Sequence, residues 1–267
     1  MNLRWIPLIA LIAFTFTTFA QNDTIFNQVD ARGFKQGFWQ KSYPEGKLMY
    51  RGEFKDNHPV GTMFRYYESG DLQAKMHFSE DGNYAAASLF YEDGDISAEG
   101  FYYQNLKDST WRYYSYYSGA LVSEENYLKG KKHGTETSYY ENGQVSELIH
   151  WQLDTKEGPW IQYFPDGKEK LKATYSFNLL NGRYYFYYEN GLMMILGNFV
   201  DSRRHGPWVF YDDAGKEKYK IEYNFGEALN ADALLKSDQE YFDFIEKNMG
   251  KFEEPTEEDF LRNGGGY

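Results

Sequence analysis

The residues of this chain best suited to bind a metal ion, or to transfer protons near neutral pH, are its histidines. They are His58, His77, His133, His150 and His205. Two of them, His133 and His205, stand in equivalent loops, "KGKKH" and "DSRRH", three repeat units apart. If each unit is a pair of strands, a spacing of about 4.8 Å per strand places the two roughly 29 Å apart, too far to share a metal. The spacing therefore predicts polar loop residues and no metal site.

The groups needed for covalent catalysis and for phosphate binding are absent from the sequence. It contains no cysteine, no G-x-S-x-G nucleophile motif and no P-loop. Carboxylates are numerous, but most recur in turns, as Glu141 and Glu189 do, where solvation explains them. We therefore expect no enzyme, no catalytic residue and no cofactor.

Aromatic residues are the one class that suggests binding, since they make up 20% of the chain. Four of them fall at one position of the repeated unit, and their rings could stack sugars or grip a protein if that face is exposed. These candidate binding residues are Trp111, Trp160, Tyr184 and Trp208. We favour the alternative that the rings pack on one another, because a thin sheet has little else to bury.

The elements that position these residues follow a strict repeat. Turn glycines recur every 24 residues, with a single spacing of 25, at Gly46, Gly70, Gly94, Gly119, Gly143, Gly167, Gly191 and Gly215. A second column, mostly glycine, lies upstream of them at Gly37, Gly61, Ala85, Ser109, Gly134, Gly158, Gly182 and Gly206. Self-similarity at this period is typical of a repeat architecture.

Each unit predicts a β-hairpin. The stretch "YYENG" at 139–143 and again at 187–191 ends an aromatic segment with a turn, and a second segment follows. Aromatic residues favour strands, and Asn-Gly or Asp-Gly permits the positive φ that tight reversals need. Positions two and eight past each turn glycine have the same parity, so we expect Leu48 and Phe54, and their equivalents, on one face.

Successive hairpins are joined by loops of six residues or fewer, too short for a helical crossover. The predicted fold is therefore an all-β repeat protein: eight antiparallel hairpins in a long, twisted, single-layer meander. Sixteen strands at about 4.8 Å give a sheet roughly 75 Å wide, which we expect to stay open.

The two ends of the chain break the repeat. Residues 1–20 read as a secretory signal peptide, with an apolar run after Arg4 and cleavage after Ala20. Residues 21–34 form a linker, and residues 35–225 hold the eight repeats. Residues 226–267 are acidic, and Ser237 with Glu240 predicts the start of a helix that caps the last hairpin. A second short helix is expected from Thr256 to Arg262.

Charge and composition limit the partners. The net charge of −12 argues against nucleic acid and against attachment to anionic lipid. The apolar run near the N-terminus is short for a membrane span, so no integral segment is expected after cleavage. An exported chain without cysteine suits a bacterium, in the periplasm, on the outer membrane or secreted.

The unit G-x-W-x-x-Y-Y-x-x-G-x-L, preceded by "KKHG" or "RRHG", resembles the MORN-repeat family over about residues 33–225. It is most similar to the variant repeat of bacterial proteins labelled YwqK-like antitoxins. The resemblance implies arrays of β-hairpins that serve as scaffolds or binding surfaces, without catalytic residues to carry over.

Together these features favour an exported, non-catalytic repeat protein that offers a protein-binding or scaffolding surface at the cell envelope. One alternative is a module that binds glycan or cell wall through its aromatic ladder. Another is a periplasmic immunity protein, similar to an antitoxin. The oligomeric state is left open, because the exposed sheet edges are able to pair with another copy.

Overall fold

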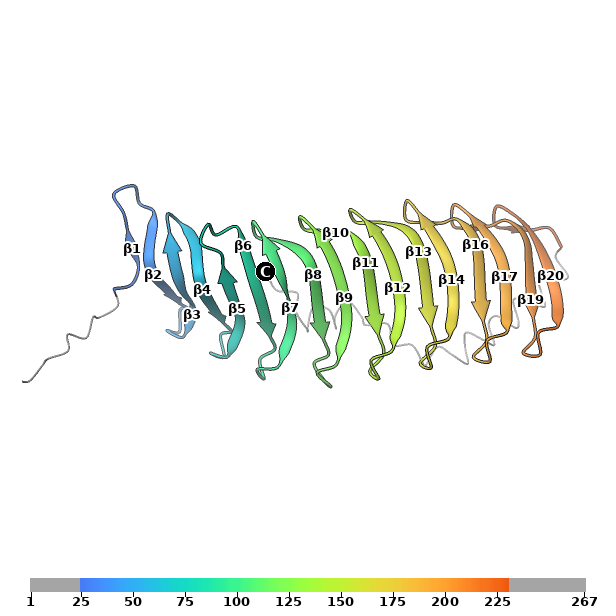
Figure 1. Ribbon diagram of the computed structural model, residues 1–267, viewed down its shortest axis with the longest axis horizontal. Coiled ribbons are helices and arrows are strands. Elements are labelled where there is room, and N and C mark those ends of the chain that lie inside the picture. Colours follow the sequence, from blue (N-terminus) through green and yellow to red (C-terminus); the bar gives the residue numbers. More distant parts are fainter. Residues whose placement is uncertain (1–24, 231–267) are drawn as a thin grey trace, which may run out of the picture.

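The computed structural model describes residues 25–230, which form an open ribbon one sheet thick (Figure 1). All regular structure in these residues is β, and every paired strand runs antiparallel to its neighbour along the chain. The strands cross the long axis of the ribbon, and its two ends do not meet (Figure 1). The predicted open, single-layer, all-β sheet is confirmed.

Eight hairpins follow one another along the ribbon. They are β2 (Lys35–Ser42) with β3 (Leu48–Lys55), β4 (His58–Tyr66) with β5 (Leu72–Phe78), β6 (Tyr84–Phe90) with β7 (Ile96–Tyr103), β8 (Leu106–Tyr114) with β9 (Leu121–Leu128), β11 (Gly134–Tyr139) with β12 (Val145–Gln152), β13 (Thr155–Tyr163) with β14 (Glu169–Ser176), β16 (Gly182–Tyr187) with β17 (Met193–Val200), and β19 (Gly206–Tyr211) with β20 (Glu217–Asn224). Each first strand also pairs with the strand before it, so one sheet runs through all eight.

Five further strands have only two residues each. Three of them, β10 (Lys131–Lys132), β15 (Leu179–Leu180) and β18 (Arg203–Arg204), are the opening residues of a hairpin's first strand, separated from the rest by an irregular residue. The other two, β1 (Gln28–Val29) and β21 (Glu227–Ala228), pair with β2 and β20 at the ends of the ribbon. These short strands cover only part of each end.

The turn inside each hairpin takes its shape from the repeated glycine. In the fifth repeat, Tyr140 N–H donates to the Gln144 carbonyl and Gly143 N–H donates to the Tyr140 carbonyl, both at 2.8 Å. Gly143 has a φ of 81°, a region that glycine enters without steric cost, whereas Asn142 has no positive φ. The repeated glycine is therefore a requirement of the backbone.

A shift of register in every hairpin corrects the expected placement of side chains on the faces. Ser138 pairs with Glu147 but Tyr139 pairs with Val145, so one residue of the second strand is skipped. Such a bulge changes the face to which later residues point. Val145 therefore lies beside Tyr163 and Leu148 around one shallow hollow, not on the face of Trp151, as strict alternation predicted.

The two faces of the sheet can now be named. The tryptophan face carries Trp39, Trp111, Trp160 and Trp208 and holds two buried clusters, one around Trp111 and one around Trp208 with Ile221. On the opposite face a row of directly paired residues crosses the ribbon, and we call it the mid-sheet row. It runs Arg51, Phe64, Lys75, Ser88, Glu99, Arg112, Glu124, Thr137, Leu148, Ile161, Lys172, Tyr185, Leu196, Val209 and Lys220.

Neighbouring hairpins are also joined by tyrosine hydroxyls. The tyrosine that opens a hairpin turn donates to a carbonyl 23 residues further on, as Tyr140 does to Tyr163 at 2.7 Å. The same bond joins Tyr43 to Tyr66, Tyr67 to Phe90, Tyr91 to Tyr114, and Tyr188 to Tyr211. Hydrogen bonds of this kind contribute about 0.5–1.5 kcal/mol each.

The expected signal peptide and the expected C-terminal helices lie outside the described residues. No helix among residues 25–230 is long and apolar enough to cross a membrane.

Candidate functional site

The four aromatic residues singled out from the sequence all lie on the tryptophan face, but they differ in exposure. Trp111 and Trp208 are 0% and 2% exposed, whereas Trp160 and Tyr184 are half-buried. The structure brings Tyr184 and Trp208 together as a stacked pair, with ring centroids 5.5 Å apart. Trp111 and Trp160 lie on separate repeats, in β8 and β13. Only Trp160 and Tyr184 therefore keep surface that a ligand can reach.

Two glycines explain why Trp111 and Trp208 are closed to solvent. A Cβ atom built at Gly100 would lie 2.5 Å from the Trp111 ring, and one at Gly197 would lie 2.4 Å from the Trp208 ring. Each indole therefore lies flat against backbone that has no side chain. These glycines follow the turn glycine by six residues. Their role was not predicted from the sequence, although their position opposite the tryptophan column was a readable signal.

Trp160 has a different surrounding, because Ile149 is its direct partner in the ladder. Its indole N–H donates to Glu147 Oε1 at 2.8 Å, and its ring lies 5.5 Å from that of Tyr175. The bulk of Ile149 holds the indole off the backbone, so part of the ring stays open.

Basic side chains cover much of the remaining aromatic surface of this face. Lys107 Nζ lies 4.9 Å from the ring centre of Trp111 and 5.2 Å from that of Tyr127. Trp151 lies between two cations, with Lys132 at 5.2 Å and Lys156 at 5.3 Å. Lys35 and Arg204 lie in the same way over the rings of Trp39 and Trp208. Cation–π contacts of this kind contribute about 0.5–2 kcal/mol each, so they stabilise the covered state of the face.

A buried charged cluster lies at the centre of this face. Lys132 Nζ contacts Glu125 at 2.9 Å and Glu136 at 2.8 Å, and Tyr127 donates to Glu125. Burial, together with the nearby charge of Glu125, raises the pKa of the Tyr127 phenol well above its usual range. Burial alone would lower the pKa of Lys132, but the two carboxylates outweigh it and raise that pKa. The raised pKa values keep Tyr127 neutral and Lys132 positively charged at neutral pH, which fits a structural role.

Three of the five histidines contact neighbouring side chains of the sheet. His77 and His150 lie within hydrogen-bond distance of Thr62 and Thr135, at 3.0 and 3.3 Å, and the His205 ring contacts that of Phe225 at 4.5 Å. Within residues 25–230, no group of three or more His, Asp or Glu side chains gathers in a way that would hold a metal ion.

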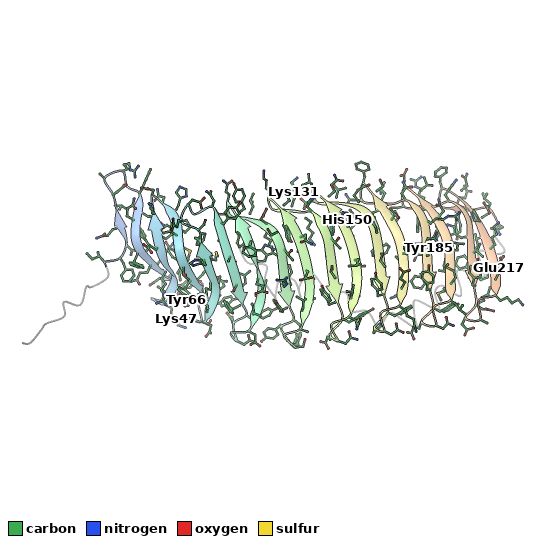
Figure 2. The ribbon with its side chains drawn as sticks, in the orientation of Figure 1. Lys47, Tyr66, Lys131, His150, Tyr185 and Glu217 are labelled. Carbon is green, nitrogen blue, oxygen red and sulfur yellow. The ribbon has the colours of Figure 1, made fainter. Side chains whose placement is uncertain are left out.

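The turns that join consecutive hairpins form one long edge of the ribbon, which we call the loop edge. In Figure 2 Lys131 marks this edge, while Lys47 lies at the other. Both central residues of each two-residue turn have positive φ, as at Phe177 (49°) and Asn178 (66°). In the sixth and seventh repeats the second residue donates laterally to the preceding turn, from Asn178 N–H to the Lys156 carbonyl and from Ser202 N–H to the Leu180 carbonyl. Equivalent bonds start from Asn57, Gly130, Asp154 and Gly226, so the lateral bonds run from turn to turn without a gap between Lys107 and Gly226.

Large apolar side chains project from the loop edge. Phe177 is 78% exposed, Phe225 52% and Leu153 48%, and all three have left-handed backbone. That conformation costs such a residue roughly 1–2 kcal/mol, and asparagine or glycine would avoid the cost. The same edge exposes Leu106, Leu128 and Leu179, together with Lys129, Lys131 and Arg203. The fold therefore carries both strain and apolar exposure here that packing does not explain.

Fold and surfaces together define a non-globular hairpin-repeat protein with long exposed surfaces. A family model described as MORN repeat variant matches residues 59–80, 132–152 and 180–201. These segments cover the second, fifth and seventh hairpins. No curated protein matches the chain. The chain therefore carries MORN repeats of the variant form at these three hairpins, and the match does not separate out the YwqK-like group. Repeats of this family indicate a binding role.

Proposed function

We propose that this chain is an exported, non-catalytic scaffold at the bacterial cell envelope that holds a protein partner along its loop edge. The observation that carries the proposal is the set of exposed Leu153, Phe177 and Phe225 side chains on strained, laterally bonded turns. One repeat separates Leu153 from Phe177, a distance of about 10 Å for two strands. A rigid edge with apolar anchors at regular spacing loses little entropy when it binds, which favours a specific protein partner.

Export rests on the N-terminal sequence, with its basic residue, apolar run and small residues ending at Ala20. Cell fractionation followed by N-terminal sequencing tests it. A mature protein that begins at Gln21 and separates with the envelope or the medium supports export. An uncleaved cytoplasmic protein contradicts it.

The binding edge is tested by a double substitution, Leu153→Asn with Phe177→Asn. Asparagine accepts left-handed backbone, so the fold should be at least as stable as before, while the apolar anchors are lost. A photo-crosslinking residue at Leu179 should capture a discrete partner in the native cell. The double variant should reduce that capture at least tenfold, without any loss of thermal stability.

The matched control is Tyr117→Asn, since Tyr117 is 90% exposed but lies in the hairpin turn after β8, away from the loop edge. It should leave the capture unchanged. Equal loss in both variants, or equal capture from a crosslinker placed at Tyr117, would show that the loop edge is not the binding surface.

Glycan binding is the second candidate, and the half-buried rings of Trp160 and Tyr184 are what supports it. Because Trp111 and Trp208 are buried, fewer aromatic rings are exposed for a glycan than the sequence suggested. Titration of tryptophan fluorescence with purified envelope polysaccharides tests it, and a Trp160→Phe variant should lose any quenching that is specific.

A further inference from the structure

The face opposite the tryptophans changes character along the ribbon. In the first half the mid-sheet row is mostly charged, and from Glu99 to Glu124 its charges are satisfied within the chain. Arg112 contacts Glu124 at 2.8 Å, and the hydroxyls of Tyr114 and Tyr139 donate to Glu99 and Glu124 at 2.8 Å. From Leu148 onward the row becomes apolar, interrupted by Lys172 and ended by Lys220.

A second, parallel row adds tyrosine rings and two glutamates to this face. Tyr163, Tyr187 and Tyr211 stand two residues beyond Ile161, Tyr185 and Val209 on the same strands, so they point to the same face. Across each hairpin they oppose Glu169, Met193 and Glu217. The hollow between Val145, Leu148 and Tyr163 opens on this face.

These side chains are half-buried only by their neighbours within the sheet, because no second layer covers either face among residues 25–230. We propose that the occupant of this face is a second copy of the chain, packed sheet on sheet over repeats five to eight. Tyr185, which lies between the two long edges of the ribbon (Figure 2), is near the centre of the contact.

The order of residues along the mid-sheet row favours a second copy and fixes its direction. A two-fold axis parallel to the strands, placed between β14 and β16, reverses the row of the partner copy. Lys172 then faces Tyr185, Ile161 faces Leu196, and Leu148 faces Val209. Apolar side chains meet apolar ones, and Lys172 of each copy meets the Tyr185 ring of the other copy.

The second row matches under the same operation. Tyr163 faces Met193, Tyr187 faces Glu169, and Tyr211 faces Val145. If the axis instead ran along the ribbon, like residues would meet, and Lys172 would face Lys172 of the partner. Like charges that face each other disfavour association, so the antiparallel arrangement is the one the sequence of the row selects.

The area available is enough for such a contact. The eight long strands of repeats five to eight span about 38 Å, and two rows of side chains cover roughly 14 Å along the strands. Each copy therefore buries on the order of 500 Å², so the total is about 1,000 Å², at the lower end of specific interfaces. Packed sheets are rotated by about 30°, so the match is closest near the axis.

The state of association and the shape of the dimer give the first test. Sedimentation velocity of the mature full chain, from about 1 to 100 µM, should show a reversible dimer. In small-angle scattering, four shared repeats and four free ones on each side should give a length of roughly 115 Å, against about 77 Å for one ribbon. A monomer over the whole concentration range overturns the proposal, and so does a dimer no longer than one ribbon.

Substitutions on the face give the second test. Leu196→Lys should weaken dimerisation at least tenfold, whereas Ser88→Lys, in the same mid-sheet row but on β6 of the third repeat and so outside the shared repeats, should leave it unchanged. Both residues lie on the open face of the sheet, so circular dichroism should match that of the unchanged protein. A dimer that resists Leu196→Lys forms through another surface.

Crosslinking between introduced cysteines tests the direction of the partner copy. Any crosslink is specific, because the chain contains no cysteine of its own. A mixture of Ile161→Cys and Leu196→Cys proteins should be joined by a short bis-maleimide, and Ile161→Cys alone should not. Crosslinking of Ile161→Cys to itself would show like residues meeting and would overturn the arrangement. In this arrangement the loop edges of both copies lie on the same side of the dimer and stay exposed. The crosslinking result therefore does not depend on whether the loop edge binds a partner.

Discussion

The side chain that faces each tryptophan across the ladder decides whether that tryptophan is buried. Gly100 and Gly197 let Trp111 and Trp208 lie flat on the backbone, whereas Ile149 leaves Trp160 partly open. The cations over the rings then complete the cover. A large indole on one strand therefore requires a small residue opposite it on the next strand. Where that residue is glycine the tryptophan is buried and stabilises the sheet, and where it is Ile149 part of the ring stays exposed.

Gly197→Ala tests this balance. The new methyl would lie 2.4 Å from the buried Trp208 ring, so the indole must move, and we expect a loss of about 1–3 kcal/mol in the free energy of unfolding. Urea denaturation measures it. The matched control is Gly52→Ala, at the same repeat position, where the neighbour at 3.1 Å is the flexible Met63. A cost at Gly197 no larger than that at Gly52 would contradict the account.

At the scale of elements, the two kinds of turn have different roles. The glycine turns inside the hairpins close each unit, whereas the turns of the loop edge bond laterally from one repeat to the next. One connection departs from this rule. Between β5 and β6 the reversal is held by Asp81, which accepts hydrogen bonds from Ser79 Oγ at 2.6 Å and from Asn83 N–H at 3.0 Å.

The Asp81 turn predicts a dependence of stability on pH. The bond from Ser79, with those from Asn83, lowers the pKa of the Asp81 carboxyl to about 2 from its ordinary 3.8. Because the unfolded chain binds this proton more readily, the contribution is present above about pH 4 and is lost as the pH falls towards 2. Urea midpoints at pH 6 and pH 2.5 should therefore differ less in Asp81→Asn than in the unchanged protein. Equal differences would mean that the carboxylate does not stabilise the turn.

At the scale of the molecule, each hairpin pairs only with its neighbours, so the ribbon has no centre on which the rest depends. Stability in such arrays is close to a sum over units and the contacts between adjacent units. The elongated shape exposes two long edges and two faces, far more surface than a compact domain of the same length (Figure 1). That surface is what the proposed partner and the proposed second copy use.

Deletion of one whole repeat tests the modular account. Removal of residues 158–181 joins equivalent positions of two units, so the remaining seven hairpins should still fold. Small-angle scattering at low concentration should show the monomer shortened by about 10 Å. Removal of residues 158–169 alone takes away one strand and leaves the next in the wrong direction, so it should prevent proper folding. Equal behaviour of the two deletions would show that the repeat is not the folding unit.

The sequence by itself determined the hairpins, their number and the open sheet, because turns and strand propensities act over a few residues and the 24-residue period repeats them. It also pointed to the face that carries Trp111 and Trp208. Only the tertiary structure decided which rings are buried, where Val145 points and which edge exposes Phe177. Those features depend on which residues stand opposite each other on neighbouring strands. A skipped residue in each hairpin changes that register without leaving any mark in the period.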